Sequence, residues 1–279
     1  MNKENEPLVL LTIAGFDPSG GAGVVADVKT FTAFDCFATA AVTSLTFQNT
    51  TGVFGAAHQT ADAVRAQVLP VVEDFTVAGV KTGMLPTEEI IAEVARLFRE
   101  TNLPAPVVDP VVRSTSGYDL IGDAALQTLI AELMPLARVV TPNIPEAERI
   151  TGMQIRDEEG MRAAASRMRE MGARAVLVKG GHLQRAEDKK FAVDVLDDAG
   201  EVSVFRGEMI ETNATHGTGC TLAAAITACL ARGMNLIEAV AVAKRFVTAA
   251  IRHAPHIGRG HSPVNHNVPV RLDNSSARD

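Results

Sequence analysis

Short apolar runs alternate with longer segments of helical periodicity along most of the chain. Residues 8–14 form a continuous apolar run, which is typical of a strand buried on both faces of a sheet. Within 24–34, Val24, Val28 and Phe31 fall on one side of a helix. The pattern predicts strands at 8–14, 37–47, 77–80, 107–108, 138–140 and 175–178, and helices at 24–34, 61–72, 87–100, 123–134, 157–171, 217–231 and 236–253.

Local signals refine several of these elements. Thr87 and Asp157 stand where helix caps are expected, directly before helical periodicity begins. Pro70 should end or kink the helix at 61–72, because proline lacks the N–H that the helix interior needs. The apolar segments 191–196 and 202–205 flank an Asp-Ala-Gly turn, which predicts a hairpin.

The alternation of strands and helices predicts the fold class, which is α/β with a mostly parallel central sheet and helices on both faces. In open parallel sheets a ligand sits beyond the carboxyl ends of the strands. We therefore expect the loops that follow the strands to converge on one cleft. These loops are polar or rich in glycine: Asp17-Pro18-Ser19, Gln48-Asn49, Lys81-Thr82-Gly83, Asp109-Pro110, Asn143 and Lys179-Gly180-Gly181.

Composition narrows the functional class. Among 279 residues, 26 Lys and Arg stand against 33 Asp and Glu, and this net charge of −7 argues against a nucleic-acid partner. No apolar run free of charges reaches ~18 residues, so no membrane span is expected. The three cysteines lack the spacing of a zinc site, and Cys36 and Cys229 are expected to be small core residues. Because three cysteines cannot all pair in disulfides, a reducing cytoplasm is the simplest location for the protein. We expect a short extension at 1–7, one domain at 8–266 and a disordered tail at 267–279.

The stretch 213–220, Asn-Ala-Thr-His-Gly-Thr-Gly-Cys, precedes an alanine-rich helix. The first amides of a helix lack internal partners and carry partial positive charge, so such a loop can hold a phosphate. Cys220 would then lie in the first helical turn, where a thiolate is stabilised and its pKa lowered. Taken alone, the stretch fits an ordinary glycine loop before a packed helix equally well.

Other motifs also have two interpretations. Residues 21–26 formally match a dinucleotide fingerprint, but the preceding turn is too long and Gln48-Asn49 replaces the expected acidic residue. Asp109 is either a carboxylate placed in the cleft or a turn former. Asn143 and Glu146 either hold a hydrated Mg²⁺ or serve the start of a helix, where Pro145 suits the first turn.

Five motifs in this order resemble the hydroxymethylpyrimidine and phosphomethylpyrimidine kinases of thiamine biosynthesis, members of the ribokinase superfamily. The resemblance covers residues 8 to about 266, and it implies a ribokinase-like three-layer sandwich. Gln48 and Cys220 together point to the pyrimidine kinases within the superfamily. The motifs are Ala14-Gly15-Phe16-Asp17-Pro18-Ser19-Gly20-Gly21-Ala22-Gly23, Gln48-Asn49-Thr50, Lys81-Thr82-Gly83-Met84, Thr141-Pro142-Asn143-Ile144-Pro145-Glu146-Ala147 and His216-Gly217-Thr218-Gly219-Cys220.

The resemblance implies roles for individual residues. It implies a pyrimidine pocket formed by Gly15, Asp27, Gln48, Met84 and Val111. It implies an anion hole formed by Gly217, Thr218, Gly219 and Cys220, in which Cys220 is the base. It also implies that Mg²⁺ and phosphate are bound by Asp109, Asn143 and Glu146, and that the nucleotide is contacted by Lys179, Thr212 and Lys244. One departure concerns the loop after Asp109-Pro110, where these kinases often carry a lysine and this chain has Thr115, with Arg113 as a substitute.

The resemblance thus implies a kinase that uses ATP and Mg²⁺. It would phosphorylate 4-amino-5-hydroxymethyl-2-methylpyrimidine and then the monophosphate to the diphosphate, as a cytoplasmic homodimer. Two alternatives stay open. One is a pyridoxal or pyridoxine kinase of the same superfamily, and the other is a non-catalytic pyrimidine-binding protein that keeps Gln48.

Overall fold

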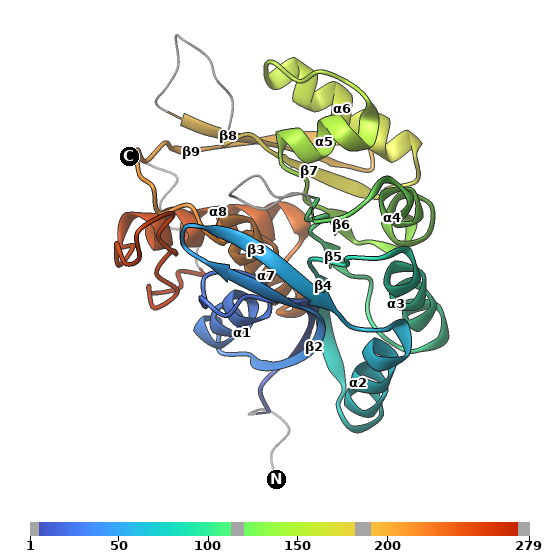
Figure 1. Cartoon of the computed structure of the whole chain (residues 1–279). Helices are drawn as coiled ribbons and strands as arrows, with labels where there is room; N and C mark the ends of the chain where they lie inside the picture. The colour runs from blue at the N-terminus through green and yellow to red at the C-terminus, as the bar shows by residue number, and fades with distance from the viewer. Residues whose placement is uncertain (1–5, 113–119, 182–190, 273–279) are drawn as a thin grey trace.

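The computed structural model describes residues 6–112, 120–181 and 191–272. In these residues nine strands form one sheet in the order β3-β2-β1-β4-β5-β6-β7-β8-β9 (Figure 1). Neighbouring strands from β2 through β7 run parallel, whereas β3, β8 and β9 pair antiparallel at the two edges. The strands are β1 (Val9–Phe16), β2 (Phe37–Asn49), β3 (Gly52–His58), β4 (Val77–Thr82), β5 (Val107–Val108), β6 (Val139–Val140), β7 (Ala175–Lys179), β8 (Phe191–Asp198) and β9 (Glu201–Glu208).

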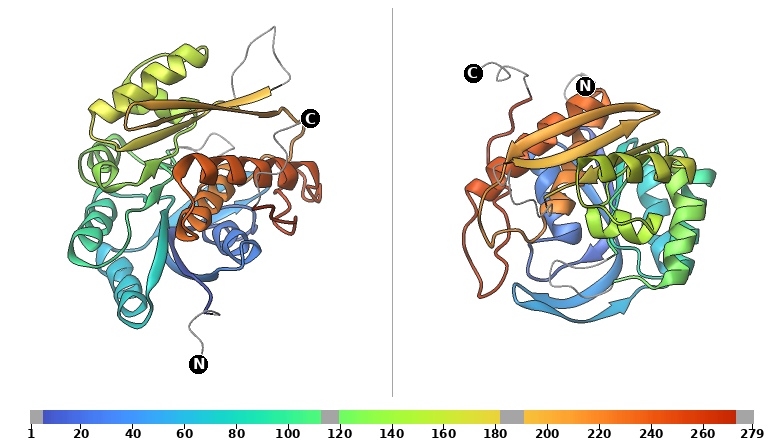
Figure 2. Two further views of the ribbon diagram at one scale, coloured as in Figure 1. Left: turned by 180° about the vertical axis from the view of Figure 1, so that it is seen from behind. Right: turned by 90° about the horizontal axis from the view of Figure 1, so that it is seen from above.

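Helices cover both faces of this sheet, which confirms the predicted α/β class and its three layers (Figures 1 and 2). On one face, a core that includes Val64, Ile90, Leu133 and Met161 packs under α2 (Ala61–Asp74), α3 (Glu88–Glu100), α4 (Asp123–Thr128), α5 (Ile144–Thr151) and α6 (Glu158–Glu170). On the other, a core that includes Phe31, Ile226 and Val240 packs under α1 (Gly23–Ala33), α7 (Thr218–Ala231) and α8 (Leu236–Arg252).

Three expectations need correction. Helix α2 continues through Pro70 to Asp74, so the proline does not end it. The sequence pattern does not predict strand β3, because its small residues lack apolar alternation. The strand follows an Asx turn, in which Asn49 Oδ1 accepts a hydrogen bond from Thr51 N at 2.8 Å. The predicted helix at 123–134 consists of α4, the π-helical turn η2 (Leu129–Leu133) and the start of the 3₁₀ turn η3 (Met134–Leu136).

The tail expected at 267–279 includes two residues that pack into the core. Val268 is buried and belongs to the core beneath α7 and α8, and Val270 packs against it. Residues 258–261 lie against the tip of the β2–β3 hairpin, where Thr50 Oγ1 accepts from the amides of Arg259 and Gly260 at 3.2 and 3.3 Å. The described C-terminal segment is therefore part of the folded domain.

The order of the strands places the cleft. The chain passes from β1 outward to β2 and β3 and then returns through α2 to β4 on the other side of β1, and such a reversal opens a crevice at the carboxyl ends of the strands. No helix in the described part of the chain is both long and apolar enough to cross a membrane.

Candidate active site

A cavity of about 870 Å³ lies at the carboxyl ends of the parallel strands, where the expected loops converge. It is continuous, and its walls come from segments spread over the whole chain. One end is lined by Gly15, Gln48, Val53, Met84 and Val111; the middle by Asp109, Asn143, Glu146, Lys179, Gly217, Thr218, Gly219 and Cys220; and the other end by Asp194, Thr212, Leu222, Lys244, Val247 and Ile251.

The first end suits a flat polar ring. A Cβ on Gly15 would lie 3.0 Å from Met84 Sδ, so glycine leaves room for the methionine side chain to pack against the end of β1. The Gln48 amide nitrogen donates to Thr46 Oγ1 at 2.7 Å, and Thr46 in turn donates to the Phe16 carbonyl at 2.8 Å. Within the described residues this is the only hydrogen bond of the Gln48 side chain. Its carbonyl oxygen and second N–H are therefore left for a ligand.

Asp27 is not in this pocket, contrary to the expectation from sequence. The residue is fully buried, and it does not line the cavity. Its Oδ2 accepts from Lys81 Nζ at 2.8 Å and from Thr12 Oγ1 at 2.6 Å. Its Oδ1 has no hydrogen-bond partner among the described residues. Asp27 thus forms a buried ion pair behind the cavity wall.

The glycine loop forms the predicted helix start. Gly217 caps α7 with φ +82°, a left-handed conformation that favours glycine. A Cβ there would also meet the Gly21 carbonyl oxygen at 1.8 Å. The Gly219 and Cys220 amides lie in the first turn, where a helix provides no internal acceptor. The Thr218 amide turns back to Thr215 O at 3.3 Å, so one of the four expected donors is already engaged.

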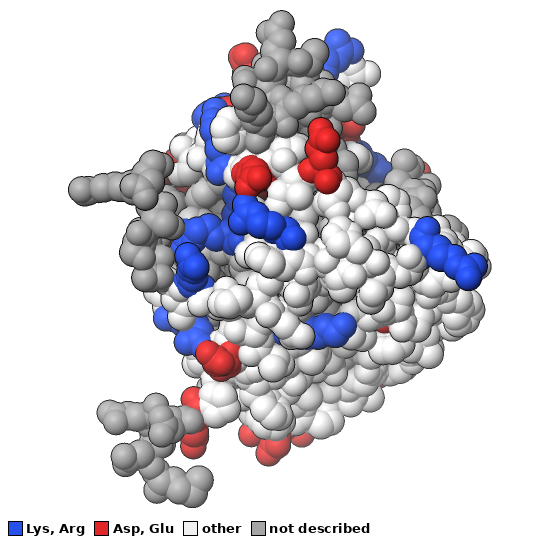
Figure 3. All heavy atoms as spheres, turned by 90° about the vertical axis from the view of Figure 1, so that its left-hand side faces the viewer, with Lys and Arg blue, Asp and Glu red and all other residues white. Residues whose placement is uncertain are grey.

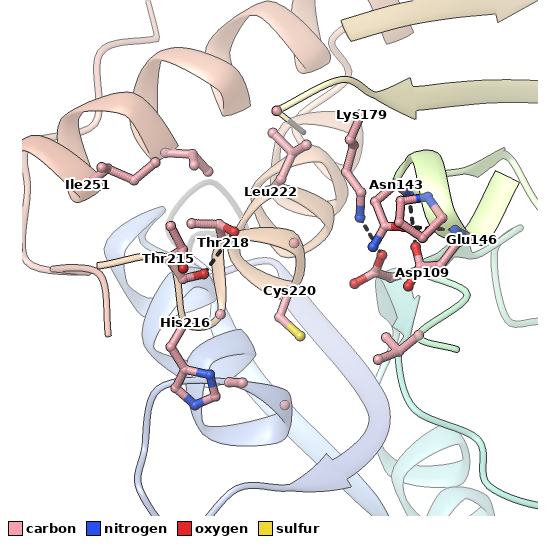
Figure 4. A pocket seen from close by; sticks show the side chains of 18 of the residues that line it. Asp109, Asn143, Glu146, Lys179, Thr215, His216, Thr218, Cys220, Leu222 and Ile251 are labelled. Carbon is pink, nitrogen blue, oxygen red and sulfur yellow. Dashed lines mark hydrogen bonds and ion pairs between the residues drawn. The ribbon is translucent and has the colours of Figure 1, made fainter. Parts of the chain in front are cut away.

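Cys220 projects from this turn into the cavity (Figure 4). Burial raises the pKa of its thiol to about 11, although Lys81 acts to lower it; Asp27 and Asp109 raise it further. The expected lowering of the pKa by the helix N-terminus is therefore wrong. Desolvation and two nearby carboxylates outweigh the helix dipole, which acts over the first turn only. At neutral pH the free protein carries a thiol here.

Asp109 and Lys179 form an ion pair beside the Gly217–Cys220 loop (Figure 4). Lys179 Nζ lies 2.9 Å from Asp109 Oδ1, which also accepts from Thr141 at 3.3 Å. Burial acts to lower the pKa of Lys179, but Asp109 and Glu146 raise it above its ordinary value. A Cβ on Gly219 would lie 3.2 Å from Lys179 Nζ, so the ammonium directly faces the loop where a phosphate would bind.

Asn143 and Glu146 form a capping box at the start of α5. Asn143 Oδ1 accepts from the Glu146 amide at 2.9 Å, and Glu146 Oε2 accepts from the Asn143 amide at 2.8 Å. Glu146 Oε1 also accepts from the Val112 amide at 3.3 Å. Burial raises the pKa of Glu146, with Lys179 opposing. The helix-start interpretation is therefore confirmed for both residues. Each Glu146 carboxylate oxygen keeps a second lone pair, and the residue lines the cavity.

The far end of the cavity holds the residues expected near a nucleotide. Lys244 pairs with Asp194, which also accepts from the Gly180 amide at 3.0 Å. Thr212 Oγ1 accepts from the Ala214 amide at 3.0 Å, so this side chain shapes its own loop. Arg113 and Thr115 lie outside the described residues.

Two features of the site were missed from the sequence. Lys81 was assigned to a polar loop, whereas it lies in β4 and is fully buried with Asp27. Asp17 and His216 were quoted only as parts of motifs, yet Asp17 Oδ2 lies 2.8 Å from His216 Nε2. An acidic and a basic residue in two separate glycine-rich motifs were the only signal available.

Comparison with known proteins adds a family to this geometry. A sequence profile for phosphomethylpyrimidine kinase matches residues 17–265. The chain is 48% identical over 257 residues to the thiamine biosynthesis bifunctional protein ThiED of Geobacter sulfurreducens, covering 92% of this chain and 52% of that protein. It is 43% identical to the hydroxymethylpyrimidine/phosphomethylpyrimidine kinase of Bacillus subtilis, covering 92% of this chain and 93% of that one. A solved structure of Bacillus subtilis pyridoxal kinase, an ADP complex, superposes with a TM-score of 0.85 at 37% identity, covering 94% of this chain and 98% of that one.

Proposed function

This chain belongs to the phosphomethylpyrimidine kinase family, and from that membership and the geometry of its cavity we infer that it transfers the γ-phosphoryl group of ATP to 4-amino-5-hydroxymethyl-2-methylpyrimidine and then to the monophosphate. One observation carries the inference. The Gly217–Cys220 loop, Lys179, Gln48 and Lys244 all line a single cavity. Gln48 lies in β2 and Asp194, the partner of Lys244, lies in β8, toward opposite edges of the sheet, whereas Lys179 ends β7 between them. A pyrimidine at one end and a nucleotide at the other would meet at the anion hole.

Phosphoryl transfer asks mainly for alignment and neutralisation of charge. The Gly219 and Cys220 amides and the Lys179 ammonium supply positive charge where negative charge accumulates on the transferred group. These donors are already fixed by the helix start and by the Asp109 pair, so little reorganisation accompanies the reaction. The Gln48 amide would form hydrogen bonds with the ring nitrogen and the amino group of the pyrimidine.

A pyridoxal kinase is the second candidate, because the Bacillus subtilis pyridoxal kinase matches this fold over 94% of the chain. Pyridoxal also presents a hydroxymethyl group on a six-membered ring. Coupled assays of ADP release with the pyrimidine alcohol, its monophosphate or pyridoxal separate the candidates. We expect turnover with both pyrimidines and a diphosphate product by mass spectrometry. Turnover with pyridoxal alone would favour the second candidate, and turnover with none would favour a non-catalytic binding protein.

Gln48→Ala is expected to weaken binding of the pyrimidine alcohol by roughly 1–3 kcal/mol, because ring donors and acceptors lose their partner in a partly buried pocket. The structure adds that Thr46 loses the hydrogen bond from Gln48 as well. Isothermal titration measures the change, with ADP as the matched control ligand. An unchanged pyrimidine affinity would remove Gln48 from base recognition.

Mg²⁺ would be held by Asp109 and Glu146 and would offset the charge of the phosphates when bound. The residues fit a hydrated ion better than a directly ligated one. Both Glu146 oxygens already accept backbone N–H groups, and Asp109 Oδ1 is paired with Lys179, whereas Asp109 Oδ2 faces Gly219. Among the described residues, no group of three or more His, Cys, Asp or Glu gathers as a metal site.

Glu146→Gln is accordingly expected to raise the Mg²⁺ concentration needed for half-maximal turnover and to lower the maximal rate. Glutamine also serves in a capping box, so α5 should keep its start. The measurement is a Mg²⁺ titration of turnover, accompanied by pyrimidine affinity without nucleotide and by melting temperature without Mg²⁺, both expected near the wild-type values. Full activity of the variant at limiting Mg²⁺ would leave Glu146 with its capping role alone.

A homodimer is proposed through the β2–β3 hairpin, whose exposed side chains include Leu45, Phe47 and Phe54. Large apolar residues gathered on an edge hairpin usually mark an interaction surface. The face in Figure 3 likewise shows a broad area with few charged residues. Sedimentation velocity tests the proposal, because Phe47→Lys with Phe54→Lys should convert dimer to monomer. A wild-type monomer would contradict it.

A cytoplasmic location is proposed from the cysteines. Cys36, Cys220 and Cys229 are all free, which suits a reducing compartment. Cell fractionation with immunodetection tests it, and recovery in a secreted or membrane fraction would contradict it.

A further inference from the structure

Asp17 is a buried carboxylate that accepts hydrogen bonds from five donors. Oδ1 accepts from the amide and the hydroxyl of Ser19 at 2.8 and 2.7 Å. Oδ2 accepts from the amides of Gly21 and Ala22 at 3.1 and 2.9 Å and from His216 Nε2 at 2.8 Å. Four donors come from its own loop, and the fifth comes from a segment almost 200 residues away. Burial acts to raise the pKa of Asp17, but the bonds from His216 and Ser19 lower it.

The loop of Asp17 and the loop of His216 are interlocked through glycines. A Cβ on Gly21 would lie 2.3 Å from His216 Cδ2, and a Cβ on Gly217 would lie 1.8 Å from Gly21 O. The imidazole therefore packs with its Cδ2–Nε2 edge against Gly21 and is bonded to Asp17 through Nε2. The His216 amide also donates to Ser262 O at 3.3 Å, which ties the loop to the C-terminal segment.

These two loops adjoin different parts of the proposed active site, the pyrimidine pocket and the anion hole. Asp17 directly follows β1, whose last residues, Gly15 and Phe16, form part of the pyrimidine end of the cavity. His216 directly precedes Gly217, the first residue of the anion hole. The Asp17–His216 bond is thus the side-chain link between the wall that holds the acceptor and the amides that hold the transferred phosphoryl group.

The arrangement is not that of a hydrolytic triad. In a Ser-His-Asp triad the serine and the carboxylate bind opposite ring nitrogens. Here Ser19 Oγ and Asp17 Oδ2 both lie against the same nitrogen, Nε2, at 3.4 and 2.8 Å. The imidazole cannot pass a proton between them, so the group holds position.

We propose that His216 is a positioning residue, bonded to Asp17 so that the pyrimidine wall and the anion hole keep one fixed separation. The proposal rests on the proposed kinase function and deepens it. Reaction requires the attacking oxygen and the phosphorus to approach within about 3–3.5 Å, and a misplacement of about 1 Å can cost ~10²-fold in rate. Both substrates still reach their own subsites when the link is broken, so the loss falls on turnover and not on binding.

The test compares His216→Leu, which removes the donor, with His216→Gln, whose amide nitrogen can take the place of Nε2. For His216→Leu we expect kcat to fall by ~10²-fold for both the alcohol and the monophosphate, while the affinities for ADP and for the pyrimidine change by less than about threefold. His216→Gln should recover most of the rate. Equal losses in the two variants, or a loss confined to substrate affinity, would overturn the proposal.

A second variant tests the proposal independently if His216→Leu does not fold. Gly21→Ala keeps every hydrogen-bonding group but pushes a methyl group into the imidazole, so it should lower kcat in the same way. The matched control is His58→Leu, which removes the bond between Ser44 Oγ and His58 Nδ1, 2.9 Å long, between two residues that do not themselves line the cavity. The control should keep wild-type kinetics. A Gly21→Ala protein with wild-type kcat would also overturn the proposal.

Hydrogen exchange of the free proteins tests the link without any substrate. His216→Leu should speed amide exchange in 19–23 and in 216–220 together, whereas His58→Leu should change neither segment. Unchanged exchange in both segments would overturn the proposal. If the wild-type protein phosphorylates neither pyrimidine, but His216→Leu still speeds exchange in both segments, the result would count against the proposed function alone.

Discussion

Replacing Cys220 with alanine is expected to slow phosphorylation of the pyrimidine alcohol by about 10²–10⁴-fold, the usual contribution of a general base. Phosphorylation of the monophosphate should slow by less than about threefold, because a phosphate nucleophile with a second pKa of ~6 is already ionised. The hydroxymethyl group must lose a proton as the new bond forms, and Cys220 projects into the cavity from the first turn of α7. The measurement is kcat/KM for each substrate.

The pH dependence follows from the thiol being protonated in the free protein. A base must be unprotonated to accept a proton, and burial raises the pKa of Cys220 to about 11. The thiolate fraction therefore grows up to tenfold per unit between about pH 7 and 10, and the rate with the alcohol should rise with it. The rate with the monophosphate should stay flat in this range. Cys220→Ala should lose the rise.

Cys220→Ser separates the base from the shape of the loop. Serine keeps nearly the same size and a hydrogen-bonding group in the first turn, but its hydroxyl does not ionise in the accessible pH range. If Cys220 serves as the base, the serine variant should be almost as slow with the alcohol as the alanine variant. Equal losses on both substrates in Cys220→Ala, with recovery in Cys220→Ser, would show that the residue only shapes the loop.

Replacing Lys81 with methionine is expected to lower the free energy of unfolding by about 3–5 kcal/mol, because it leaves a buried carboxylate without its counter-charge. Lys81 and Asp27 are both fully buried and 2.8 Å apart. Burial acts to lower the pKa of Lys81, but Asp27 and other nearby acidic groups raise it above its ordinary value, so the ammonium is charged at neutral pH. Asp27 Oδ1 already lacks a partner among the described residues, so only the neutral Thr12 hydroxyl would still donate to this carboxylate, at Oδ2. Urea unfolding measures the change.

Two further variants test whether the loss of stability in Lys81→Met comes from the unpaired buried carboxylate. Adding Asp27→Leu to Lys81→Met should restore most of the lost stability, because exchanging a whole buried ion pair for apolar side chains is often neutral. Arg167→Met breaks an exposed ion pair, Arg167 with Glu170 at 2.9 Å, and should change stability by no more than about 1 kcal/mol. A Lys81→Met protein as stable as the Arg167→Met protein would show that Asp27 is protonated in the fold.

Repeating local patterns made most of the fold predictable. The apolar run at the start of β1 and the helical periodicity of α1 and α3 depend on side chains a few residues apart, so they can be read without the rest of the chain. Caps at Thr87 and Asp157 are local in the same way, and both accept from the amide three residues on. Helix α2 shows the limit of such reasoning. Val64 and Val68 are fully buried against the core, and packing outweighs the one hydrogen bond that Pro70 removes.

The motifs likewise located the site, because the strands that carry them run parallel and end at one edge of the sheet. Gln48, Met84, Gly219 and Lys179 all line the cavity, as their positions after strands or at a helix start predicted. Asn143 and Glu146 were predicted as neighbours with two possible roles, and the structure shows the capping box.

Only the tertiary structure decided how the charged groups are paired and what their pKa values are. Lys81 and Asp27 lie 54 positions apart, and Asp17 and His216 lie 199 apart, so no local pattern relates them. The pKa of Cys220 depends on burial by segments from across the chain and on the distance to two carboxylates, Asp27 in α1 and Asp109 directly after β5. Hydrophobic periodicity is a property of neighbours in sequence, whereas desolvation and Coulomb energy are properties of neighbours in space, and these exist only once the chain has folded.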